Sequence, residues 1–70
     1  MKRIGKKLYA LRKHHGLTIN QLAKELQISN AQISRIENGI HKPSGELILR
    51  IADFFGVDVN QLMRDELEVE

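Results

Sequence analysis

The chain has 70 residues and a mass of 8.0 kDa, which is enough for one small domain. It is 41% hydrophobic and 29% charged and contains no cysteine, which excludes a disordered chain, a disulfide scaffold and a thiolate metal site. No apolar run approaches the roughly 18 residues of a membrane span, and no secretory signal is present, so we expect a cytoplasmic protein without a membrane partner.

The formal net charge of +2 is divided unevenly along the chain. Residues 1–50 carry ten Lys or Arg against three acids, a balance of +7, whereas residues 51–70 carry one against six, a balance of −5. A basic body followed by an acidic end indicates a polyanionic partner for one face. Ordinary solvated charge remains the alternative interpretation at this point.

Apolar spacing is helical along almost the whole chain. Ile4, Leu8 and Leu11 are spaced for one buried face of a first helix, and Gly16 suits its left-handed C-cap. A capping residue precedes each later helical pattern, in the order Thr18, Ser29, Ser44 and Asp58. The sequence therefore predicts an all-α fold with five helices, over residues 3–15, 19–26, 30–38, 45–55 and 59–66.

No segment is typical of a strand, and no repeat or low-complexity stretch interrupts the helical pattern. We therefore expect one domain over residues 1–64, with residues 65–70 as an acidic tail or the start of a linker. Several apolar residues near the end are not clearly needed inside. They either complete the small core or form a dimer interface, and they are Leu49, Phe54, Val59, Met63 and Leu67.

The second and third expected helices are separated by about three residues, which favours the steep crossing of a helix-turn-helix. Ile33 and Ile36 define the inward side of the third helix. Its outward side then carries Ala31, Ser34, Arg35 and Asn38, with Asn30 and Gln32 on the flanks. Asn, Arg and a methyl group are side-chain types that contact adenine, guanine and thymine edges. An ordinary polar surface is the alternative.

The order of spaced residues resembles the Cro/phage-repressor (XRE-type) helix-turn-helix family of bacterial and phage transcriptional regulators. The resemblance covers roughly residues 4–63 and rests on Gly16, Leu17, Thr18, Leu22, Ala23, Ile28, Ser29, Ile33, Ser34, Glu37, Asn38, Gly39 and Pro43, continuing through Ile51, Ala52, Phe55, Gly56, Val57 and Leu62. It implies a compact five-helix lambda-repressor-like domain whose third helix enters the major groove of operator DNA, usually as part of a dimer.

The resemblance also implies roles for individual residues. Base contacts would come from Asn30, Ala31 and Arg35, with Gln32 and Ser34 at neighbouring base contacts. Phosphate contacts would come from the start of the second helix, the end of the third and the loop after it: Thr18, Ile19, Asn20, Asn38, His41 and Lys42.

Two positions depart from the family pattern. Position 19 is often Gln in the family and bonds a phosphate; Ile19 has no polar group for that bond, so Asn20 or backbone amides would replace it. Position 27 is often Gly, so Gln27 either adopts a left-handed conformation or the turn takes another form.

Arg12 and Glu37 both lie at the edge of an apolar stripe. The resemblance implies a partly buried ion pair between them that links the first helix to the third. Direct contact of these charges with DNA is the alternative interpretation.

The sequence offers no catalytic or metal-binding pattern. His14, His15 and His41 lack ligand spacing, and no nucleophile has an evident base partner, so we expect no enzyme, no metal and no cofactor. The resulting hypothesis is a sequence-specific regulator, a repressor that binds double-stranded operator DNA as a homodimer, with a regulatory protein as a further partner. The alternative is a protein-interaction module, such as an antitoxin-like protein.

Overall fold

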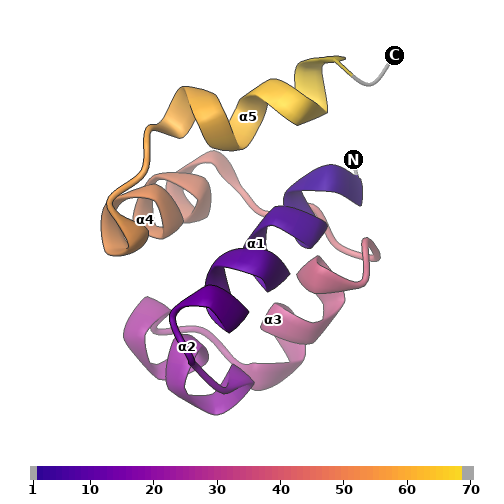
Figure 1. The fold of residues 1–70 in the computed structure, drawn as a ribbon. Helices are drawn as coiled ribbons and strands as arrows, with labels where there is room; N and C mark the ends of the chain where they lie inside the picture. The colour runs from indigo at the N-terminus through magenta and orange to yellow at the C-terminus, as the bar shows by residue number, and fades with distance from the viewer. Residues whose placement is uncertain (1, 69–70) are drawn as a thin grey trace.

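Five α-helices build the protein, and the computed structural model describes residues 2–68, with side chains described for residues 4–63. The helices are α1 (Lys2–His14), α2 (Ile19–Leu26), α3 (Asn30–Glu37), α4 (Gly45–Phe55) and α5 (Val59–Glu68). Figure 1 shows α1 at the centre of the fold, packed between α3 and α5, while α2 contacts α3 and α4. No strand occurs in residues 2–68, so the all-α prediction is confirmed.

The core collects one apolar stripe from every helix. Its most deeply buried side chains are aliphatic and at most 2% exposed: Ile4, Leu8, Leu22, Leu26, Ile33, Ile36, Ile51 and Leu62. Burying a side chain of this size stabilises the fold by about 1.5–3 kcal/mol. Aliphatic packing therefore holds together a domain that has no disulfide and only three aromatic residues.

The expected caps are present where the sequence places them. Thr18 Oγ1 accepts the N–H of Gln21 at 3.0 Å, and Gln21 Oε1 accepts the N–H of Thr18 at 2.8 Å. Ser29 and Gln32 form the same reciprocal box at the start of α3. Because each box satisfies two backbone donors that a helix start would leave unpaired, these caps fix where α2 and α3 begin.

Helix boundaries differ from the expected ones by one or two residues. The first helix covers residues 2–14 rather than 3–15, and α3 ends at Glu37, with Asn38 as its C-cap. The last helix reaches Glu68, two residues beyond the expected end. The domain boundary predicted after residue 64 falls within this helix.

A close approach between α1 and α3 occurs at Gly5, which is buried inside α1. A Cβ atom at this position would lie 2.2 Å from the carbonyl oxygen of Ile36 and 3.1 Å from that of Glu37. Only glycine lets the backbones of the two helices come this near. The position of α3 on the body of the protein therefore depends on a residue with no side chain.

Two of the apolar residues for which the sequence left core and dimer interface as alternatives lie on the surface. Leu49 is 57% exposed and Phe54 is 39% exposed. The core interpretation is wrong for both, because the buried stripe of α4 is already filled by Leu47, Ile48, Ile51, Ala52 and Phe55. Val59 and Met63 are half-buried and pack against the core, and the side chain of Leu67 lies outside the described residues.

Candidate nucleic-acid interface

The turn between α2 and α3 is closed by a left-handed residue. Gln27 has φ 60° and ψ 42°, and its N–H donates to the carbonyl of Lys24 at 3.2 Å. The N–H of Ile28 donates to the carbonyl of Ala23 at 3.0 Å, and the Ala23 side chain is buried between the helices. Of the two possibilities that the sequence leaves open for Gln27, the structure has the left-handed one.

The exposed part of α3 is short and polar. Asn30, Ala31 and Arg35 are exposed, whereas Ser34 is half-buried. Glu37 is the only acid of the helix, and it points to α1. We call Asn30, Ala31, Ser34, Arg35 and Asn38 the recognition face. Its one formal charge is the guanidinium of Arg35.

Gln32 is turned away from the recognition face toward α4. Its Oε1 accepts the backbone N–H of Ser29 at 3.4 Å as part of the capping box. Its half-buried side chain lines a small hollow together with Ser44 and Arg50. Gln32 was predicted to contact a base, but in the structure its amide oxygen belongs to the capping box of α3.

The last turn of α3 is closed by Asn38. Its Nδ2 donates to the carbonyl of Ser34 at 2.8 Å and to Ser34 Oγ at 3.3 Å. Beyond it, the N–H groups of Ile40 and His41 donate to the carbonyl of Arg35 at 2.9 and 3.2 Å. These bonds hold the following loop, with its exposed His41 and Lys42, against the C-terminal end of α3.

A side-chain hydrogen bond joins the starts of α2 and α3. Asn30 Nδ2 donates to Asn20 Oδ1, and both side chains are exposed. Ile19, the residue before Asn20, is half-buried and packs against the core. The structure therefore places a polar group of α2 beside the recognition face, at position 20 and not at position 19.

The N-terminus of α2 has backbone amides that precede its helical hydrogen bonds. The first intrahelical bond runs from the N–H of Leu22 to the carbonyl of Thr18, so the N–H groups of Ile19 and Asn20 precede the hydrogen-bonded part of the helix. Such a terminus favours phosphate oxygens. Lys13 lines the hollow beside these residues and adds a positive charge there.

Arg12 and Glu37 form the ion pair expected from the sequence. Arg12 Nε donates to Glu37 Oε2 at 2.7 Å and Nη2 donates to Oε1 at 3.0 Å, with both side chains less than a tenth exposed. Arg12 Nη1 also donates to the carbonyl of Leu17 at 3.0 Å, and the Tyr9 ring lies 5.2 Å from the guanidinium carbon. The hydrogen bond with Glu37 raises the pKa of Arg12.

This ion pair fixes α3 relative to α1. Two parallel hydrogen bonds between a guanidinium and a carboxylate restrict both distance and orientation. The same pair removes the only acid of α3 from the surface that would face an anionic partner. The direct-contact interpretation of these charges therefore has no support in the structure.

Gly5 is the positioning residue that the sequence analysis missed. Its contact with the Ile36 and Glu37 carbonyls lies at the same α1–α3 junction as the ion pair. A glycine inside an otherwise strong helical pattern was the available signal, because such a glycine costs about 1 kcal/mol relative to alanine and is kept for a packing reason.

In the part of the chain that the structure describes, no group of three His, Asp or Glu side chains is placed to hold a metal ion. No helix among these residues is long and apolar enough to cross a membrane.

Comparison with known proteins places this geometry in a family. A family model described as helix-turn-helix matches residues 8–62. The ImmF control region 10 kDa protein of Bacillus phage phi105 is 41% identical over 69 residues, which cover 93% of this chain and 77% of that protein. The HTH-type transcriptional regulator MJ0272 of Methanocaldococcus jannaschii is 43% identical over 56 residues, covering 80% of this chain and 85% of that protein.

A longer relative and a solved structure agree with this placement. The transcriptional repressor RghR of Bacillus subtilis is 41% identical over 66 residues, and the chain spans 47% of its length. The restriction-modification controller protein C.AhdI of Aeromonas hydrophila has the same fold, with a TM-score of 0.79 at 24% identity over 87% of this chain and 92% of that one. The resemblance stated from the sequence is confirmed: the chain belongs to the helix-turn-helix family.

Proposed function

We propose that the protein is a sequence-specific transcriptional regulator that binds double-stranded DNA in the cytoplasm and represses by occupying an operator. In this proposal α3 lies in the major groove, and Arg35, Asn30 and Ala31 contact base edges. Thr18, Asn20 and the amides at the start of α2, together with Lys42 in the loop after α3, contact phosphates and set the register.

The recognition face is the observation that carries this proposal. Asn30, Ala31 and Arg35 are exposed on one short helix, and the ion pair from Glu37 to Arg12 removes the acid that would repel a phosphate backbone. Donors fixed on a rigid helix suit base readout, because a guanidinium can bind both acceptors of a guanine. Catalysis has no comparable support in the arrangement of these residues.

Selection of bound sites from random duplex DNA tests the proposal directly. We expect a recovered motif, and affinity that falls steeply as salt is raised. Arg35→Ala should cost about 1–3 kcal/mol on the selected site and relax the preference at one base pair. Lys24→Ala, an exposed charge on α2 outside the recognition face, is the matched control. Absence of salt-sensitive binding would favour the alternative of a protein-interaction module.

We propose further that the regulator binds its operator as a homodimer, with the exposed side of α4 as the contact surface. Leu49 and Phe54 support this assignment, because both are large apolar side chains left on the surface of a small domain. Two-fold symmetry would place two copies of α3 about 34 Å apart, one turn of B-DNA.

The dimer proposal is tested separately from DNA binding. Leu49→Glu should lower the mass measured by light scattering at a concentration where the unaltered chain is dimeric, because a charge in an apolar contact is costly. Glu46→Gln, on the same helix and exposed, should leave the mass unchanged. A monomeric mass for the unaltered chain, free and on its operator, would overturn the dimer proposal.

A further inference from the structure

Asn38 differs from the other asparagines of the chain in its neighbour and in its backbone. It precedes Gly39 and is the C-cap of α3, with φ −90° and ψ 3°. Asn20, Asn30 and Asn60 precede larger residues and lie inside α2, α3 and α5. Asparagine loses its side-chain amide most readily before glycine, because the next residue then has no side chain to shield its backbone nitrogen.

Loss of the amide at Asn38 requires water as the only co-reactant. The backbone nitrogen of Gly39 gives up its proton to the solvent and attacks Asn38 Cγ. The bond from Cγ to Nδ2 then breaks, and Nδ2 takes a proton from the solvent and leaves as ammonia. Water opens the resulting cyclic imide at one of its carbonyl carbons, which yields aspartate or isoaspartate. In either product a carboxylate has replaced the neutral amide.

Few hydrogen bonds hold the turn at Asn38 against this reaction. The side chain of Asn38 is exposed, and its Nδ2 donates to the carbonyl of Ser34 at 2.8 Å. The N–H of Gly39 donates to the carbonyl of Ile36 at 3.1 Å. Both bonds lie at the end of α3, where a last turn opens without disturbing the packed side chains of the core. Gly39 has φ 76° and no side chain, so the opened turn rotates with little hindrance.

The other asparagines are held more firmly. Asn20 and Asn30 lie in first turns that reciprocal capping boxes close, and the backbone N–H of Asn60 donates to Asp58 Oδ1 at 3.0 Å. To bring the next backbone nitrogen onto Cγ, each of these residues must leave its helical conformation. That step breaks the start of a helix, whereas Asn38 already lies beyond the last residue of α3.

A carboxylate at residue 38 cannot replace the contacts of the amide. The Nδ2 donor of Asn38 would become an oxygen, so two acceptors would face each other at the Ser34 carbonyl. The new negative charge would also lie at the C-terminus of α3, the negative end of the helix dipole. Both effects loosen the turn that leads into the loop with Lys42.

We propose that Asn38–Gly39 is a site of spontaneous deamidation in the folded protein, and that the acid formed at residue 38 weakens DNA binding. Formation of the acid goes beyond the proposed function and does not depend on it. The effect on affinity rests on the proposed function, because the recognition face is where the new carboxylate would meet the phosphate backbone. Deamidation would thus switch off the regulator irreversibly, with no ligand and no enzyme.

Mass spectrometry of tryptic peptides, after ageing of the full chain at mildly alkaline pH below its unfolding temperature, tests the modification. Trypsin places the asparagines in separate peptides, over residues 14–24, 25–35, 36–50 and 51–64. We expect acid in peptide 36–50 while the other three keep their amides. Asn38→Gln should leave this peptide unconverted, because the longer side chain would have to close a larger ring.

The same chain unfolded in guanidinium chloride provides the time scale. The proposal is overturned if the folded chain keeps its amide at residue 38 over the time in which the unfolded chain loses it. It is equally overturned if Asn20, Asn30 or Asn60 is converted as fast as Asn38 in the folded chain.

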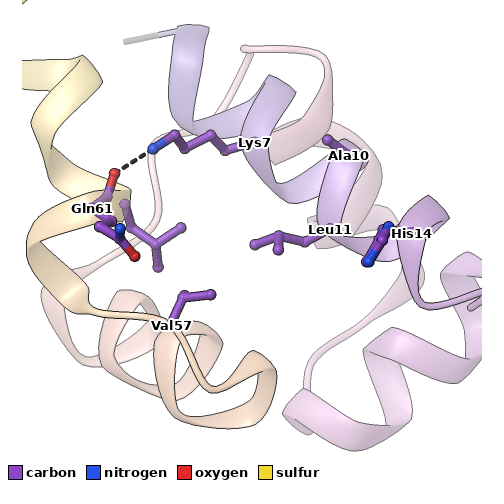
Figure 2. A pocket seen from close by; sticks show the side chains of 7 residues that line it. Lys7, Ala10, Leu11, His14, Val57 and Gln61 are labelled. Carbon is purple, nitrogen blue, oxygen red and sulfur yellow. Dashed lines mark hydrogen bonds between the residues drawn. The ribbon is translucent and has the colours of Figure 1, made fainter.

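The effect on DNA binding is measured with a variant that mimics the product. Asn38→Asp should lower the affinity for the selected DNA site about tenfold, because like charges brought together at an interface are costly. Asn60→Asp adds the same charge on α5, next to Gln61. Gln61 lines a groove between α1 and α5, of about 640 Å³, that no residue proposed to contact DNA lines (Figure 2). This control should lower the affinity less than about twofold, since solvent screens a distant charge.

Equal losses for the two Asp variants would overturn the effect on affinity. If the unaltered chain binds no duplex DNA, the proposed function fails and that effect fails with it. The peptide masses still decide whether Asn38 deamidates, so the two failures are distinguishable.

Discussion

Replacing Gly5 by alanine sets helix propensity against packing, and the structure predicts which effect is larger. In an exposed helix the change would stabilise the protein by about 1 kcal/mol. Here the new Cβ would lie 2.2 Å from the Ile36 carbonyl oxygen, 1.2 Å short of the 3.4 Å at which ordinary van der Waals contact begins. A backbone carbonyl has no rotamer that relieves the overlap, so α1 and α3 must separate.

Separation of the two helices loosens the whole α1–α3 junction, including the Arg12–Glu37 pair. Overpacking of this kind costs up to about 3 kcal/mol, so the net loss after the propensity gain is roughly 2 kcal/mol. For a domain of this size that lowers Tm by about 8–16 °C in a thermal melt followed by circular dichroism.

Gly45→Ala is the matched control for this prediction. Gly45 is the first residue of α4, and a Cβ there meets nothing within 4 Å. This variant should raise Tm slightly, by the amount expected from about 0.5 kcal/mol of lost freedom in the unfolded chain. A Tm for Gly5→Ala equal to or above that of the unaltered protein would refute the close approach of α1 and α3.

The remaining predictions concern single polar residues. Glu37→Gln should lower the free energy of unfolding, measured by urea denaturation, by about 3 kcal/mol because it leaves the buried Arg12 charge uncompensated. Glu46→Gln removes the exposed partner of Arg50 and should lower it by less than about 1 kcal/mol. Equal losses for the two variants would contradict the argument from burial. Gln27→Gly should stabilise the protein by about 0.5–1 kcal/mol, since it removes left-handed strain that exceeds the entropy cost of glycine, and a lower Tm would refute this. Lys42→Ala should weaken binding to specific and random duplexes alike and reduce the salt slope by about 0.9, and a loss confined to the specific site would contradict a phosphate contact.

Local patterns predicted the helices because each pattern determines a helix start or a helix end through residues that are close in the sequence. A hydroxyl followed three residues later by Gln satisfies two backbone donors whatever the tertiary context, so Thr18 and Ser29 correctly marked the starts of α2 and α3. Glycine after an apolar period ends a helix for a similarly local reason, and Gly16 and Gly56 both have positive φ. The fold class followed from these events and the resemblance together.

Tertiary geometry was not predictable from the same patterns. The apolar spacing along α4 does not determine how much of the helix surface the neighbouring helices cover. It therefore did not exclude Leu49 from the core, although Leu49 is exposed in the structure. The close contact at Gly5 depends on where α3 lies, which no residue near Gly5 in the sequence specifies. The groove between α1 and α5 likewise arises from the relative placement of two helices that are more than forty residues apart.

The departure at position 19 shows how tertiary placement can compensate for a changed side chain. Ile19 contributes to the core, so the polar contact expected at the start of α2 is absent from that residue. Asn20 carries an exposed amide instead, and its Oδ1 accepts a hydrogen bond from Asn30 on the recognition face. An amide that accepts through its oxygen still has its own NH₂ group to donate. In the proposed complex that group is available to a phosphate, so Asn20 would anchor α2 and orient Asn30 at the same time.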